Sequence, residues 1–239
     1  MFSSPEVCKF TLSNIYMRSN PTTVAYGCKA VSALALCPSK QNHKLLVEMQ
    51  VIEILQELSV VSFCHHTEVL TNSLMALASL VDGVSIFQNR VSVSAIVSVM
   101  EENYINRPVI AAALTALLSV FSVLTISKCD ESNKKILTSP VTVKIILDCI
   151  RHHVTSERVG LLGCRLITLL CQNFKNIHKE FMEFGVCNFI MDVFKVHKRS
   201  VEVLQEVAGS AVVVCRLNFT CVSALCELGL VSTISSLLR

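Results

Sequence analysis

The stretch Val24-Ala-Tyr-Gly-Cys-Lys-Ala-Val-Ser-Ala-Leu34 returns later in the chain, with similar chemistry, as Leu161-Leu-Gly-Cys-Arg-Leu-Ile-Thr-Leu-Leu170. Apolar residues at positions i, i+3, i+4 and i+7 of each stretch predict an amphipathic helix. Two such similar helices, far apart in one chain, indicate an internal repeat of the kind that builds stacked helical arrays. The aligned pairs are Gly27/Gly163, Cys28/Cys164, Lys29/Arg165, Val31/Ile167, Ser32/Thr168 and Leu34/Leu170.

The same helical pattern occurs three more times, in segments 72–80, 113–120 and 209–215. The last apolar residue of each helix serves as an anchor, and successive anchors are spaced 46, 40, 50 and 45 residues apart. These anchors are Leu34, Leu80, Val120, Leu170 and Cys215. The spacing predicts a repeat of about four dozen residues, within the range of helical repeat proteins.

A second landmark has the same period. Glu183-Phe-Gly-Val186 recurs as Glu227-Leu-Gly-Leu230, and Glu48-Met-Gln-Val51 occupies the same slot in the first repeat. We expect Gly185 and Gly229 to adopt the left-handed conformation that ends a helix. The middle repeats instead have Asn89-Arg-Val91 and Ser139-Pro-Val141 in this slot.

Each repeat is therefore expected to contain a long helix, a polar break, a short helix and a further apolar helix, in that order. The polar breaks are expected at residues 38–43, 129–134 and 172–176. Short helices are expected to follow, for example from Lys44 to Met49, with apolar helices after them such as 51–60 and 186–196.

Three helices per period resemble the armadillo family, whose repeats have a long third helix of small and aliphatic residues and an acidic-apolar-Gly-apolar step. Segments 159–173 with 183–194, and 203–218 with 227–238, carry the resemblance best. It implies an all-α, right-handed superhelical solenoid of armadillo/HEAT-like repeats, and a HEAT stack also fits. We expect one armadillo-like helical domain, 1–239, with repeats 1–21 (partial), 22–67, 68–107, 108–156, 157–201 and 202–239 (incomplete).

The predicted end repeats lack polar caps, which stacked repeats need for solubility. The chain opens in a partial repeat and closes on apolar Ile234, Leu237 and Leu238. We therefore expect the chain to be part of a larger protein or to dock end to end with further repeats.

Charge and cysteine content indicate which class of partner and which cellular compartment to expect. The net charge is only +3 and no dense stripe of Lys and Arg exists, so a nucleic-acid partner is not expected. Most of the twelve cysteines lie in apolar helical stretches, and the first residues lack the apolar core of a signal peptide. We expect a reducing, cytoplasmic location in which the thiols are packing residues.

Residues 108–127 carry no formal charge and are long enough to span a bilayer. A membrane-associated helical protein is therefore the alternative function. Thr115, Ser119 and Ser122 fall on one helical face, however, as in a buried repeat helix with a less apolar edge. The repeat register favours this second interpretation, with no membrane partner.

Motifs of catalysis or cofactor binding are missing, including GxSxG, HExxH, the P-loop and GxGxxG. The doublets His65-His66 and His152-His153 do not chelate by themselves, because adjacent helical residues diverge by about 100°. Cys221 and Cys226 have the wrong spacing for a zinc knuckle. We expect no catalytic, cofactor or metal site, although a reactive cysteine remains an open third hypothesis, since thiol reactivity depends on environment.

The armadillo resemblance implies a concave groove, lined by the third helices, that holds an extended peptide. By position, the groove residues are expected to be Lys29, Ser32, Met75, Thr115, Arg165, Thr168, Gln172 and Ser210. The two cations suit an acidic segment, or else only solubilise the groove. The chain has no Trp, and Asn173 and Asn218 fall at predicted helix ends, so a nuclear-import role is not expected. The predicted function is a protein-protein interaction scaffold or adaptor without catalysis.

Overall fold

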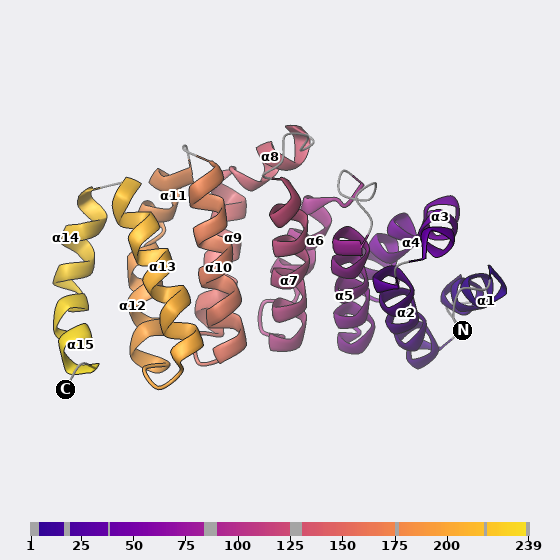
Figure 1. Ribbon diagram of the computed structural model, residues 1–239, viewed down its shortest axis with the longest axis horizontal. Coiled ribbons are helices and arrows are strands. Elements are labelled where there is room, and N and C mark those ends of the chain that lie inside the picture. Colours follow the sequence, from indigo (N-terminus) through magenta and orange to yellow (C-terminus); the bar gives the residue numbers. More distant parts are fainter. Residues whose placement is uncertain are drawn as a thin grey trace. The chain divides into compact units, whose positions relative to one another are not determined.

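The computed structural model describes residues 5–16, 20–37, 39–83, 90–124, 131–174, 177–217 and 219–237. All regular secondary structure in these ranges is helical (Figure 1). The chain forms two compact units, Met1–Lys134 and Lys135–Arg239. The prediction of an all-α repeat protein is confirmed.

In the first unit, three long helices lie side by side in chain order: α2, α5 and α7 (Figure 1). Helix α5 packs against α2 on one side and α7 on the other, while shorter helices cover them. The helices of this unit are α1 (Pro5–Tyr16), α2 (Pro21–Leu36), α3 (Lys40–Glu48), α4 (Val51–Glu57) continued by a π-helical turn (Leu58–Ser62), α5 (Thr67–Gly83), α6 (Val93–Glu102) and α7 (Arg107–Leu124).

In the second unit, the long helices α10 and α13 make the largest contact (Figure 1). The helices of this unit are α9 (Pro140–His152), α10 (Glu157–Asn173), α11 (Ile177–Glu183), α12 (Val186–Val196), α13 (Val201–Leu217), α14 (Phe219–Glu227) and α15 (Leu230–Leu237), while α8 (Glu131–Leu137) crosses the division between the units.

Each of the five predicted anchor segments lies within one of the long helices α2, α5, α7, α10 and α13. Within a unit, each long helix packs chiefly on the next long helix. This is the nearest-neighbour arrangement of a solenoid, in which stacking buries apolar faces that one repeat cannot bury alone. The boundaries of the individual repeats remain predictions.

The polar breaks are shorter than expected, and at the first of them a serine starts a helix. Ser39 accepts a hydrogen bond from the backbone N–H of Asn42, so residues 40–43 are the first turn of α3 rather than a loop. Likewise α10 continues to Asn173, within the break expected at 172–176. The break expected at 129–134 gives way to α8 from Glu131, and residues 129–130 and 175–176 lie outside the described ranges.

The glycine position of the Glu-apolar-Gly-apolar step, the second landmark, has the predicted left-handed conformation. Gly185 has φ 74° and Gly229 has φ 89°, and Gln50 takes the same conformation with φ 51°. The middle repeats start the corresponding helix differently. Ser92 and Ser139 cap α6 and α9 by accepting hydrogen bonds from Ala95 and Thr142, which replaces the glycine step.

Helix α7, in the segment considered as a membrane span, is buried along most of its length. Ala113, Leu114, Leu117 and Phe121 are almost wholly inaccessible to solvent. Among the helices that the structure describes, none combines the length and the hydropathy needed to cross a bilayer. Residues 125–127 lie outside the described ranges, as do the side chains of Ile234, Leu237 and Leu238.

Candidate partner-binding face

Two polar side-chain contacts link α2 to α5 on the side where the groove is predicted. We call each such contact between neighbouring long helices a rung. The Lys29 ammonium lies 3.4 Å from a carboxylate oxygen of Glu68 and also 5.0 Å from the centre of the Tyr26 ring. The Ser32 and Ser79 hydroxyl oxygens are 2.5 Å apart. Because both partners come from the next long helix, Lys29 and Ser32 fix the packing of neighbouring repeats.

The same pair of rungs links α10 to α13 in the second unit. Arg165 donates through Nε to Glu206 at 2.8 Å, and its Nη2 lies 3.6 Å from Glu202. The hydroxyl oxygens of Thr168 and Ser210 are 2.9 Å apart. The resemblance between residues 24–34 and 161–170 thus extends to the contacts that these helices make.

Ser210 is fully buried, and its hydroxyl oxygen lies 2.8 Å from the Cys164 carbonyl oxygen and 2.9 Å from the Glu206 carbonyl oxygen, which share its single proton as acceptors. Its position on α13 turns toward α10 rather than outward. The Ser210 hydroxyl therefore stabilises the packing of α13 on α10 and is not accessible to a partner.

Helices α5 and α7 are joined by other groups. The Ser119 hydroxyl donates to Asp82 at 3.0 Å, and the Asn106 amide donates to the Thr67 hydroxyl at 2.6 Å. Thr115 donates to the Ala111 carbonyl of its own helix. Of the remaining predicted groove residues, Met75 and Thr115 are half-buried, and Gln172 is exposed.

Apolar groups are exposed on the same long helices. Tyr26 and Leu36 on α2 are 62% and 61% exposed, and Val212 on α13 is 50% exposed. A Cβ added at Gly209 would have no atom within 4 Å, so another molecule's backbone could approach α13 there. These residues mix apolar and polar groups, as partner-binding surfaces do.

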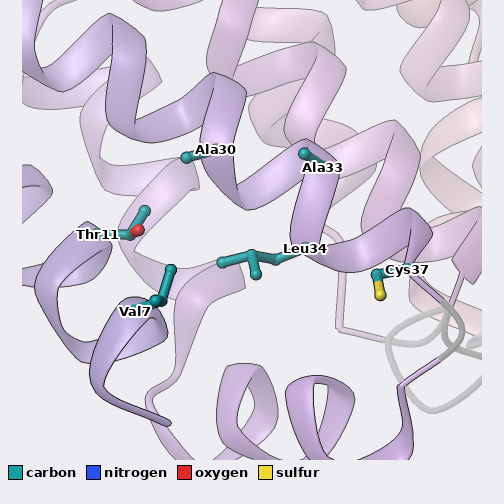
Figure 2. A pocket seen from close by; sticks show the side chains of 6 residues that line it. All are labelled: Val7, Thr11, Ala30, Ala33, Leu34 and Cys37. Carbon is teal, nitrogen blue, oxygen red and sulfur yellow. The ribbon is translucent and has the colours of Figure 1, made fainter. Parts of the chain in front are cut away.

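A cavity of about 310 Å³ lies between α1 and α2 of the first unit. Figure 2 shows Val7 and Thr11 of α1 facing Leu34 of α2, with Ala30, Ala33 and Cys37 completing the lining. Its walls are almost entirely apolar. The cavity lies apart from the rungs, and we assign no ligand to it.

The predicted chemistry of the thiols agrees with their burial. Burial raises the pKa of Cys28 and Cys164 to about 12, so both remain protonated and weakly nucleophilic at neutral pH. Of the His doublets, His65 lies in the turn before α5, and His152 and His153 lie at the end of α9. Throughout the described ranges, no group of three or more His, Cys, Asp or Glu residues is placed to hold a metal ion.

No protein-family model and no curated protein matches the sequence. Solved structures do match. An engineered protein with a crystal structure superposes with a TM-score of 0.70 at 15% identity, over 97% of this chain and 90% of its own. A designed armadillo repeat protein in complex with the peptide (KR)4 matches with a TM-score of 0.63 at 15% identity, over 97% and 90% of the two chains. Another designed armadillo repeat protein gives 0.64 at 14% identity, over 94% and 90%.

The chain has an armadillo-like helical repeat fold. In this armadillo-like chain, the groove residues inferred from position fall on the long helices, and two of them pair with acids that the helical pattern did not predict. Glu68 follows Lys29 by 39 residues and Glu206 follows Arg165 by 41. An acid recurring about one period after a cation was the signal that could have identified these pairs.

Proposed function

We propose that the protein is an interaction scaffold or adaptor that binds an extended segment of a partner along its third-helix face. We define this face for each unit by itself, as the exposed sides of α2, α5 and α7 in the first unit and of α10 and α13 in the second. The observation that carries the proposal is the repeated pair of rungs, which holds exposed residues such as Tyr26 and Val212 in place before a partner arrives.

Preorganisation favours this mode of binding because the scaffold loses little conformational entropy, leaving mainly the cost of ordering the segment. Tyr26, Leu36 and Val212 supply apolar contact area, and Gln172 supplies an amide for a peptide backbone. The designed armadillo repeat protein solved in complex with the peptide (KR)4 supports a peptide as ligand.

The first test locates the binding surface. A photo-crosslinking amino acid is placed at Gln172 or Ala208, both exposed on the long helices, and in matched controls at Asp192 or Lys195, both exposed on α12. After irradiation in lysate of the native cells, we expect adducts at the first pair and few at the control pair. The crosslinked partner peptide, mapped by mass spectrometry, identifies the segment. Equal crosslinking at both pairs would refute the proposed face.

The second test concerns the charge of the segment. We propose an acidic segment, which would compete with Glu68 for Lys29 and with Glu206 for Arg165. Replacing Glu68, Glu206 and also Glu202, the second partner of Arg165, by Gln frees both cations. We then expect an acidic segment to bind several-fold tighter, because exposed ion pairs are worth about 0.2–1 kcal/mol each. The variant pair Lys29→Gln and Arg165→Gln should weaken binding. Unchanged affinity in both variants would show that these cations act only within the fold.

A further inference from the structure

Three sulfur atoms from three different helices meet inside the second unit. The Cys221 thiol of α14 lies 2.8 Å from the Met182 sulfur of α11, and the Cys187 thiol of α12 lies 3.7 Å from it. The Cys187 and Cys221 side chains also share a hydrogen bond. Both thiols are almost wholly buried. We call these three residues the sulfur triad.

The left-handed turn at Gly185 brings two of these residues together. In an uninterrupted helix, Met182 and Cys187 would point about 140° apart, because five residues advance the helix by about 500°. The helix is broken instead, as the Gly185 N–H donates to the Met182 carbonyl and Gly185 takes φ 74°. Cys221 then approaches from the following repeat.

Packing alone does not require sulfur at these positions. In the matching slot of the first repeat, where Glu48 corresponds to Glu183, the equivalents of Met182 and Cys187 are the aliphatic Val47 and Ile52. At these two positions the second unit has a thioether and a thiol where the first has hydrocarbon.

We propose that the sulfur triad is a binding site for Cu(I), held by the thiolates of Cys187 and Cys221 and the thioether of Met182. Soft thiolate and thioether ligands select Cu(I), whereas structural zinc is usually held by four nitrogen or sulfur ligands, with no place for a thioether. Met182 also distinguishes this site from a simple disulfide pair, because a thioether takes no part in disulfide formation. On binding, each thiol releases its proton to solvent as a sulfur–copper bond forms, and copper stays in the +1 state throughout.

The thiols of the triad are protonated in the metal-free chain because they are buried. Burial raises the pKa of Cys187 to about 12, with further contributions from Cys221 and Cys215. Burial, and then the neighbouring Cys221, also raise the pKa of Cys171 to about 12. These thiols are therefore protonated in the metal-free chain, and Cu(I) must displace their protons in order to bind. Cys171 and Cys215 place further soft sulfur near the triad.

The test is a titration of the purified full chain with Cu(I), without oxygen, against a chromophoric Cu(I) chelator. We expect one Cu(I) per chain, and a loss of affinity of more than about 100-fold in the variant Cys187→Val with Cys221→Val, exceeding the usual effect of residues around the ligands. The control, Cys28→Val with Cys164→Val, removes two buried thiols elsewhere and should keep wild-type affinity.

Met182→Leu provides a second variant, because it conserves volume and leaves the fold intact. It should lower the affinity about tenfold and change the sulfur coordination seen by X-ray absorption. Equal affinity of the wild type and both triad variants would overturn the proposal. Equal losses in the control would also overturn it, as would preferential binding of Zn(II) over Cu(I).

Discussion

Gln50 adopts a backbone conformation that glycine adopts at the two equivalent positions. Its φ of 51° lies in the left-handed region, which costs residues with a Cβ roughly 1–2 kcal/mol. Gln50→Gly removes this strain but gains flexibility in the unfolded chain, so we expect a net stabilisation of about 0.5–1 kcal/mol. Urea unfolding followed by circular dichroism measures it.

The reciprocal change is the control for Gln50. At Gly185, φ is 74° and an added Cβ would lie 2.8 Å from an Arg151 guanidinium nitrogen. Gly185→Ala should therefore destabilise the chain by more than about 1 kcal/mol. Stabilisation by this change would contradict the role assigned to the landmark slot.

Two glycines within long helices should respond oppositely to alanine. Gly209→Ala should stabilise the second unit by up to about 1 kcal/mol, because the added methyl meets no atom within 4 Å and alanine favours the helix. Gly163→Ala should destabilise it, since the methyl would lie 3.2 Å from Phe189 and 3.3 Å from Ile150. Thermal unfolding of the two single variants checks the difference in sign.

At the scale of elements, Arg151 holds the junction between α11 and α12. Its guanidinium donates to the Phe184 carbonyl and, at 2.6 Å, to the Gly185 carbonyl. The Phe184 carbonyl lies just past the end of α11, and the Gly185 carbonyl also accepts from the N–H groups of Asn188 and Phe189 at the start of α12. One side chain of α9 thereby joins three helices.

Arg151→Ala should cost about 1.5–3 kcal/mol, as expected for hydrogen bonds made by a charged group. Hydrogen exchange should accelerate in α11 and α12 more than in α13. Arg151→Lys keeps the charge but loses the forked geometry, so it should recover only part of the stability. Full recovery by Lys would show that charge alone matters.

Elements were predictable where periodicity dominates. The five long helices follow from their apolar spacing, because stacked repeats bury the same helical face each time. The start of α3 could not be predicted, because Ser39 caps the helix through one hydrogen bond that composition does not reveal. The predicted groove residues lie on the long helices, and their role in binding stays a prediction. The burial of Ser210 depends on how α13 rotates against α10, which one sequence does not specify.

At the scale of the whole molecule, the buried thiols should make the free energy of unfolding fall as the pH becomes alkaline. Burial raises the pKa of Cys28, Cys164 and Cys171 to about 12 in the folded chain, from 9.0. Between these values the unfolded chain binds fewer protons than the folded one, so stability falls as pH rises. The expected slope is at most about 1.4 kcal/mol per pH unit for each thiol.

Urea unfolding at pH 8, 9.5 and 11 measures this slope. The variant Cys28→Val with Cys164→Val should show a smaller loss than the wild type, because two of the responding groups are gone. An identical loss would assign the alkaline sensitivity to groups other than these thiols.

The packing of each long helix chiefly on the next has a mechanical consequence. In the first unit, the main helix contacts of α2 and of α7 are both with α5, so a pull along the stack is borne by successive interfaces in series. The stack of long helices should therefore stretch elastically, as a spring does, with the extension shared among the helix–helix interfaces. Beyond its yield point it lengthens in steps, as one helix after another peels away from its neighbour.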